Sequence, residues 1–345
     1  MKLKEWINIF VIVLLLGFSF YRFQNRTFSN QRTLLLLDTQ IEIFVLSRSN
    51  HVDSLIEEAF QIIERYELLL SYHNSNSVLY KINQGSVSSS ENGNKHPCPS
   101  TEGNMFEICE DFYAVLRMAE QIYYKSNHLY DVSIARLFDI WDFEEAVIPS
   151  DAEIEFARQY IGFGHIKFDA NSLFLPTGFK LNFGSLAKGY IVDKVMEMLI
   201  ESNVKEAFIN AGGDIRFFSN YNRRWRVGIR HPRDLFSNIV VLNIPDMAVA
   251  TSGDYERYFI LDGTRYHHIL NPSTGFPATP TISVTVLSPT AFLADALSTA
   301  ALVMNPFDAI EMIRLFENTD AVIFFYDEND EPISLRTENI RRWIR

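Results

Sequence analysis

The residues best suited to chemistry are a carboxylate and a hydroxyl that stand four positions apart. Residues 294–299 read Ala-Asp-Ala-Leu-Ser-Thr, inside a segment from Ala291 to Met304 whose pattern predicts a helix. Asp295 and Thr299 therefore project from one face of that helix. A hard cation such as Mg²⁺ prefers these oxygens and completes its shell with water and phosphate. Such a pair can form a metal site. Taken without other motifs, the two residues are better explained as an acid that interacts with the helix dipole and a hydroxyl that bonds to the helix backbone.

A phosphate-binding site is indicated by residues 181–190, which read Leu-Asn-Phe-Gly-Ser-Leu-Ala-Lys-Gly-Tyr. Here a predicted strand passes through a glycine and a serine into an amphipathic helix, predicted from Ala187 to Glu201. Free backbone N–H groups at a helix start attract phosphate, and Lys188 adds a full charge. Taken alone, a capped helix start with a solvated lysine explains the segment as well.

A candidate proton-transfer group lies in residues 267–277, which read His-His-Ile-Leu-Asn-Pro-Ser-Thr-Gly-Phe-Pro. His268 sits between a predicted strand and a turn, where a rigid loop can present it to a cleft. Histidine can relay a proton near neutral pH. A structural histidine bonded to backbone remains the alternative. Two further segments, Gly212-Gly213-Asp214 and residues 251–254, suit tight turns, and the second also offers hydroxyls to a ligand.

In their order and spacing along the chain, these five motifs resemble the ApbE family, the magnesium-dependent FAD:protein FMN transferases. The resemblance implies that Ser185, Asp295 and Thr299 bind Mg²⁺. It also implies a proton-transfer role for His268. Three positions near these motifs match family contacts with FAD, namely Asn182, Lys188 and Ile269. The family usually has an aspartate where this chain has Asn182.

The amino-terminal half carries weaker family matches. Residues 127–132 resemble a segment that places flavin contacts on Leu129, Tyr130 and Asp131. His73 falls where an aromatic side chain often stacks on the flavin. Leu37 occupies the place of an apolar contact, followed by Asp38 where the family has glycine. The similarity covers nearly the whole chain past residue 33.

The function implied by the resemblance is cleavage of FAD and covalent attachment of FMN to a Thr or Ser hydroxyl of an exported acceptor protein, with release of AMP. Two alternatives stay open. Water could replace the acceptor hydroxyl, which would make the chain an FAD pyrophosphatase. Departures from the family pattern, at Asp38, His128, Asn182 and Asn271, leave room for a flavin-binding surface protein without catalysis.

The pattern of helices and strands predicts an α+β fold, a single large domain with an extensive, largely antiparallel sheet and flanking helices. We expect this domain to span residues 33–345, after a linker at 26–32. Residues 84–104 are rich in Ser, Asn, Gly and Pro, which indicates a flexible surface insertion. Within the domain we expect one strand over Thr33 to Ser47, a helix over Phe106 to Ser126 and a hairpin over Leu173 to Phe183.

Residues 1–25 predict a signal or anchor segment, because Lys2 and Lys4 precede an apolar run from Trp6 to Tyr21. We expect an uncleaved membrane anchor that places the domain outside the cytoplasm, in the periplasm or on the outer face of the inner membrane. A buried amino-terminal helix is the alternative. The net charge of −12 argues against nucleic-acid binding. Cys98 and Cys109 fit no zinc pattern and could be free or paired.

Overall fold

The computed structural model describes residues 26–86, 103–329 and 331–344, together with residues 6, 10 and 12–17. Its centre is an eight-stranded sheet in the order β1-β2-β6-β7-β10-β13-β14-β15, in which every neighbouring pair is antiparallel. The strands are β1 (Phe28–Leu36), β2 (Thr39–Ser47), β6 (Glu206–Ala211), β7 (Asp214–Ser219), β10 (Ala248–Gly253), β13 (Thr281–Ser288), β14 (Asp320–Tyr326) and β15 (Pro332–Arg336). The predicted α+β class with one large antiparallel sheet is confirmed.

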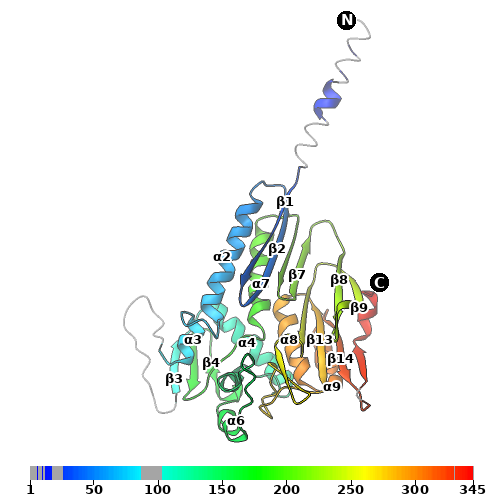
Figure 1. Ribbon diagram of the computed structural model, residues 1–345. Helices are drawn as coiled ribbons and strands as arrows, with labels where there is room; N and C mark the ends of the chain where they lie inside the picture. The colour runs from blue at the N-terminus through cyan, green and yellow to red at the C-terminus, as the bar shows by residue number, and fades with distance from the viewer. Residues whose placement is uncertain are drawn as a thin grey trace.

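Both faces of this sheet are covered, because its central strands bury alternate residues on opposite sides. In β10, Ala248 and Ala250 pack into the main core while Val249 packs into a second one. The main core is completed by helices α2 (Val52–Leu70), α4 (Glu110–Lys125), α7 (Ala187–Glu201), α8 (Ala291–Val303) and α9 (Pro306–Arg314). The second core lies under the hairpin of β8 (Trp225–His231) and β9 (Asp234–Ile244). Figure 1 shows the helices and this hairpin around the sheet.

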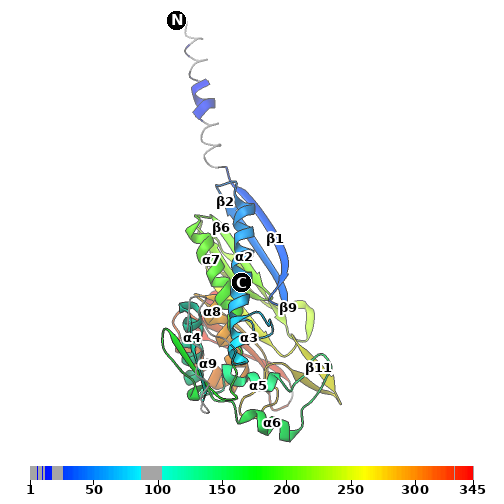
Figure 2. The same cartoon turned by 90° about the vertical axis from the view of Figure 1, so that its left-hand side faces the viewer.

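Smaller elements surround one end of the sheet. They comprise α3 (Val78–Asn83), α5 (Ala135–Phe138), α6 (Asp151–Arg158), the short sheet of β3 (Gly103–Glu107), β4 (Lys167–Phe168) and β5 (Ser172–Pro176), and the two-stranded ribbon of β11 (Tyr258–Leu261) and β12 (Thr264–His267). Three 3-10 turns complete the described chain, at Val132–Ile134, Phe163–His165 and Glu338–Arg342. Figure 2 shows the ribbon, α5 and α6 at the end of the domain opposite the start of β1.

The single strand predicted over Thr33 to Ser47 is wrong. The chain reverses at Leu37 and Asp38, which have φ of 55° and 56°, and Leu36 pairs with Thr39. Two successive residues with positive φ make the tight turn that joins β1 to β2. β1 begins at Phe28, inside the segment expected to be a linker.

Two further boundaries differ from the prediction. The helix expected from Phe106 begins at Glu110, because Gly103–Glu107 forms β3. The hairpin expected over residues 173–183 does not form: β5 pairs with β3 and β4 instead. Of the predicted insertion, residues 87–102, which include Cys98, lie outside the described residues, whereas Cys109 is exposed at the start of α4.

The predicted anchor also lies largely outside the described residues, which include only residues 6, 10 and 12–17 of that segment. Among the parts of the chain that the structure describes, no helix combines the length and the apolar character that crossing a bilayer requires.

Candidate active site

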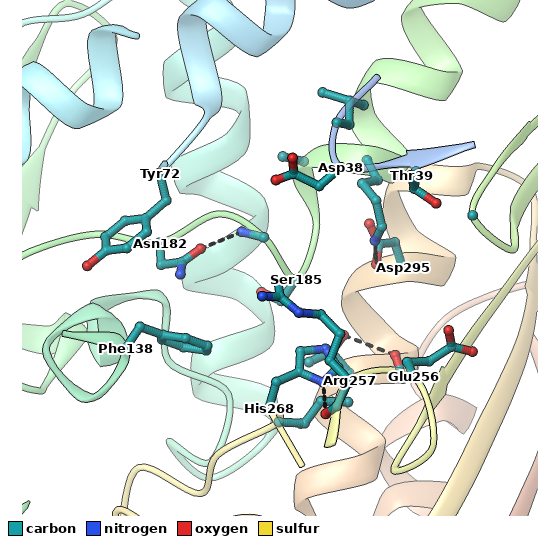
Figure 3. Close-up of a pocket in the computed structure, with 18 of the residues that line it drawn as sticks. Asp38, Thr39, Tyr72, Phe138, Asn182, Ser185, Glu256, Arg257, His268 and Asp295 are labelled. Carbon is teal, nitrogen blue, oxygen red and sulfur yellow. Dashed lines mark hydrogen bonds and ion pairs between the residues drawn. The ribbon is translucent and has the colours of Figure 1, made fainter. Parts of the chain in front are cut away.

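A cleft of about 710 Å³ opens where the β1–β2 turn, the starts of α7 and β7, and the inner face of α8 meet the loops on either side of the β11–β12 ribbon. All the predicted site residues line this cleft, although they come from distant parts of the sequence. They are Leu37, His73, Leu129, Tyr130, Asp131, Asn182, Ser185, Lys188, His268, Ile269, Asp295 and Thr299. Figure 3 shows ten residues of the cleft with labels, among them Asn182, Ser185, His268 and Asp295.

Asp295 is held in the cleft by contacts between α7 and α8. The backbone N–H of Gly189 donates a 2.9 Å hydrogen bond to Asp295 Oδ2. The helices approach so closely there that a Cβ on Gly189 would lie 2.3 Å from the carbonyl oxygen of Ala291. Asp193 of α7 also accepts hydrogen bonds from the N–H groups of Ala291 (3.0 Å) and Phe292 (2.9 Å), the first residues of α8. The start of α8 is therefore fixed to α7, and Asp295 with it.

Lys188 lies between two buried carboxylates. Its Nζ is 2.8 Å from Asp214 Oδ2 and 3.6 Å from Asp295 Oδ1. Burial alone would lower the pKa of Lys188, but these two charges outweigh it and hold the pKa above its usual value. Burial raises the pKa of Asp214 to about 7, with Asp295 adding to the rise and Lys188 opposing it. The sequence predicts Asp214 only as part of a tight turn, whereas the structure places it in the cleft.

The hydroxyls predicted to bind a metal lie in two small networks. Ser185 Oγ donates to the Tyr130 hydroxyl at 2.9 Å. Thr299 Oγ1 lies 3.1 Å from Ser252 Oγ, which lies 2.8 Å from Ser298 Oγ. Burial raises the pKa of Tyr130, so its hydroxyl stays protonated. The hydroxyl oxygens of Ser185 and Thr299 each keep a lone pair that these contacts do not use, because a hydroxyl can accept two hydrogen bonds.

These donors suit Mg²⁺ better than zinc or iron. Within the described ranges, no three His, Cys, Asp or Glu side chains converge in the manner of a protein-only metal site. The predicted metal site within the cleft has instead one carboxylate, Asp295, and the hydroxyls of Ser185 and Thr299. Mg²⁺ commonly keeps several waters and binds through one or two carboxylates and substrate phosphates. The adjacent Asp214 oxygen, which is buried without a well-directed hydrogen bond, adds further negative potential.

His268 is oriented by the backbone of Arg257. Its Nδ1 lies 3.3 Å from the Arg257 carbonyl oxygen, and its backbone N–H donates to the same oxygen at 3.1 Å. A proton on Nδ1 therefore leaves the Nε2 lone pair free. Burial, His267 and the positive charge of Arg257 lower the pKa of His268 to about 4. The ring is neutral at physiological pH and is able to accept a proton. By contrast, His267 is buried, and its Nε2 is bonded to the Ala278 carbonyl at 2.9 Å.

Two predicted cofactor contacts hold their own loops together. Asp131 accepts hydrogen bonds from Ser133 on Oδ1 and from the Phe163 N–H on Oδ2, so both carboxylate oxygens are engaged. Asn182 Oδ1 accepts from the Gly184 N–H at 2.8 Å, which shapes the turn into α7. In the described part of the chain the Asn182 side-chain nitrogen has no hydrogen-bond partner, so that it remains available to a ligand.

An apolar and aromatic wall forms the other side of the cleft. Ile269, Leu129 and Leu37, which the resemblance gives as cofactor contacts, are apolar residues that line the cleft. His73, expected to stack on a flavin, is exposed and meets Tyr72 edge to face at 5.1 Å. Sequence reasoning missed the larger rings of this wall, which are Tyr72, Phe138, Trp141 and Phe143. Phe138, Trp141 and Phe143 lie close together in the sequence, and this aromatic cluster is the signal that could have identified the wall.

A family model described as the ApbE family matches residues 37–323. The chain belongs to the ApbE family. Two curated relatives of this ApbE-family chain are FAD:protein FMN transferases, both 28% identical to it. The protein from Treponema pallidum aligns over 321 residues, 86% of this chain and 84% of the relative. The protein from Klebsiella pneumoniae aligns over 324 residues, 92% of this chain and 94% of the relative.

Solved structures agree with this assignment. The ApbE protein from Thermotoga maritima matches with a TM-score of 0.79 and 30% identity, over 92% of this chain and 100% of that one. The flavin transferase ApbE from Vibrio cholerae also reaches 0.79, over 92% and 100%, but at 23% identity it supports the fold alone. The predicted family is confirmed, and so is the prediction that the ApbE-family chain is a transferase.

Proposed function

We propose that this ApbE-family chain is a Mg²⁺-dependent FAD:protein FMN transferase that attaches FMN to a Thr or Ser hydroxyl of an acceptor protein and releases AMP. The observation that carries the proposal is the single cleft that gathers every predicted site residue from positions 37 to 299. Its apolar wall suits the flavin ring, and its polar side suits the pyrophosphate. The curated relatives are named FAD:protein FMN transferases, which supports the transfer of FMN from FAD to a protein.

The residues that would hold Mg²⁺ are Ser185, Asp295 and Thr299. When bound there, the ion supplies positive charge that offsets the negative charge on the pyrophosphate. Lys188, held beside Asp295, adds a cationic group to the same side of the cleft. Asn182 offers an amide to the flavin or the adenine edge. Tyr72 and the aromatic residues from 138 to 143 exclude water from the flavin side.

In the proposed reaction, the acceptor hydroxyl oxygen attacks the phosphorus of the FMN half of FAD. The bond between that phosphorus and the bridging oxygen breaks, and AMP leaves with the electron pair. The hydroxyl proton passes to Nε2 of His268, which is neutral because its pKa is lowered to about 4. The Arg257 carbonyl holds the ring in the orientation that exposes Nε2. The products are a phosphoester-linked FMN and AMP.

The test is incubation of the purified protein with FAD, MgCl₂ and a candidate acceptor protein. We expect AMP in solution and a flavin on the acceptor that survives denaturation, located by mass spectrometry on a Thr or Ser residue. EDTA should abolish both products, and Asp295→Asn should lower the rate roughly 10²-fold or more. Free FMN formed without acceptor would instead identify water as the nucleophile and the chain as an FAD pyrophosphatase. Tight FAD binding without AMP release would refute catalysis.

We also propose that residues 1–25 anchor the domain outside the cytoplasm, where it would modify exported acceptors. The support is the pair of lysines before an apolar run. Proteolysis of intact spheroplasts tests this proposal, because an extracytoplasmic domain is digested while a cytoplasmic control protein survives. Protection of the domain would refute it.

A further inference from the structure

The charge on the cleft is unbalanced. Among the described residues that line it, full positive charge comes from Lys188 and Arg257 alone, whereas the Asp and Glu side chains are Asp38, Glu67, Asp131, Asp142, Glu144, Asp214, Glu256 and Asp295. Lys188 is committed to two of these carboxylates, at 2.8 and 3.6 Å. Across the residues that the structure describes, the Arg257 guanidinium has neither a hydrogen bond nor an ion pair. Arg257 is thus the cation of the cleft that is left for a ligand.

The β11–β12 ribbon fixes Arg257 beside the predicted proton acceptor. Tyr258 pairs with His267 at the base of the ribbon, so the residues on either side, Arg257 and His268, face each other. The carbonyl of Arg257 accepts both hydrogen bonds that orient His268, at 3.1 and 3.3 Å. Figure 3 shows the Arg257 side chain extending into the cleft in the direction of Ser185, away from the Glu256 carboxylate.

The chemistry of phosphoryl transfer distinguishes the two phosphates that such an arginine could bind. The group that accepts the hydroxyl proton must lie on the side of the phosphorus from which the hydroxyl attacks. The leaving oxygen departs from the opposite side, roughly in line. Because the backbone of Arg257 lies next to His268 and its side chain extends into the cleft, its guanidinium is placed to meet the oxygens of the phosphoryl group under attack rather than the AMP that leaves. Arginine suits those oxygens because its planar fork can donate two parallel hydrogen bonds.

We propose that Arg257 binds the phosphate of the FMN half of the substrate and holds it for attack beside His268. This inference rests on the proposed function and deepens it, because it gives Arg257 a role in binding the substrate. It predicts that the cleft recognises FMN through its phosphate. Riboflavin lacks that phosphate, and AMP carries a different one, so neither depends on Arg257.

The test measures equilibrium binding of FMN, riboflavin and AMP to the full chain in MgCl₂, by flavin fluorescence for the first two and calorimetry for AMP. Arg257→Gln should weaken FMN binding roughly 10- to 100-fold, as expected for loss of a charged hydrogen-bonded pair. Binding of riboflavin and AMP should stay unchanged. Arg257→Lys should fall in between, because it keeps the charge without the fork.

The matched control is Arg265→Gln in the same ribbon, where the guanidinium lies over the Tyr258 ring, 3.8 Å from its centroid. This variant should bind FMN as the wild type does. A loss confined to AMP would overturn the assignment, and so would equal FMN affinity of the wild type and Arg257→Gln. A wild-type protein that binds no FMN overturns it too. AMP release from FAD, measured separately, then decides whether the proposed transferase activity survives.

Discussion

The close contact between α7 and α8 predicts that Gly189→Ala is damaging although it lies inside a helix. Alanine at an interior helical position normally gains about 1 kcal/mol over glycine. Here the new Cβ would lie 2.3 Å from the Ala291 carbonyl oxygen and 2.8 Å from the Asp295 Cβ. The first neighbour is backbone, so it cannot rotate away. The two helices must separate instead.

The magnitude follows from the groups that move. Restoring an ordinary contact requires a separation of about 1 Å, and overpacking of this kind costs about 1–3 kcal/mol. The same movement stretches the 2.9 Å hydrogen bond from the Gly189 N–H to Asp295. Loss of a hydrogen bond to a charged group costs about 1.5–3 kcal/mol. After the gain in helix propensity, we expect a net loss of roughly 1.5–5 kcal/mol in the free energy of unfolding.

Urea unfolding measures the stability of Gly189→Ala, and AMP release from FAD at a series of MgCl₂ concentrations measures the site. We expect the rate to fall about 10²-fold, as for a misplacement near 1 Å. Gly164→Ala is the control, because its Cβ would meet only the Tyr123 hydroxyl at 3.6 Å. That variant should stay within about 0.5 kcal/mol of the wild type. A Gly189→Ala protein with wild-type stability and rate would refute the claim that this contact positions Asp295.

Three further variants test the titrating groups. His268→Gln should lower kcat/KM for transfer about 10²- to 10⁴-fold and remove the acid limb near pH 4 that protonation of His268 causes; an unchanged limb would exclude His268 as its source. Burial raises the pKa of Asp193 in the folded protein to about 6, so the wild type loses stability as pH rises from about 4 to 6. Asp193→Asn should therefore flatten the dependence of the free energy of unfolding on pH. Urea unfolding of both proteins checks this, and parallel pH profiles would contradict it. Lys188→Met should lower the free energy of unfolding by about 3 kcal/mol. The loss should be smaller at pH 6 than at pH 8, because Asp214, with its pKa raised to about 7, can take up a proton at the lower pH. An equal loss in urea unfolding at both pH values would argue against the Lys188–Asp214 pair.

The helices that carry the site were predictable from the sequence. The apolar stripe of α7 repeats every three to four residues, and α8 is a long, mostly apolar segment that is buried on nearly every side. The first hairpin was not predictable. Its turn uses Leu37 and Asp38 at positive φ, positions where glycine or asparagine is usual, and the apolar run into Leu37 conceals the reversal. A leucine in this conformation costs about 1 kcal/mol, and the turn that contains it lines the cleft.

Non-local pairing explains the other errors. The residues of β5 alternate as a hairpin strand would, and Pro176 to Gly178 offers a plausible turn. The partners of β5 are β3 and β4, and β3 is separated from β5 in the sequence by the three helices α4, α5 and α6. No sequence pattern within a few residues of β5 indicates a pairing partner as distant as β3. Sequence periodicity predicted the strand, and only the packed structure supplies its neighbours.

The same limit applied to the site. Lys188 and Asp295 were each recognised from a motif, but no motif reports that they lie 3.6 Å apart. Asp214 was read as part of a glycine turn, with Gly212 at φ 61° and Gly213 at φ 108° as that reading requires. The turn and the ion pair are both present, because the turn is what aims the carboxylate at Lys188. One residue can satisfy a local pattern and still belong to the cleft.

The charges explain how a cleft that we propose to bind a phosphorylated ligand can carry so many acids. Two unit charges 4 Å apart interact by about 4 kcal/mol at an effective dielectric constant of 20. A pyrophosphate placed beside Asp295 and Asp214 would therefore be repelled strongly, and Lys188 is already engaged by both. Arg257 balances only one further charge. Such a cleft accommodates a pyrophosphate only together with added positive charge, so the acids favour a cation and the cation in turn favours the phosphates. A basic cleft would bind the same ligand without a metal ion, and its binding of the ligand would then not depend on the metal.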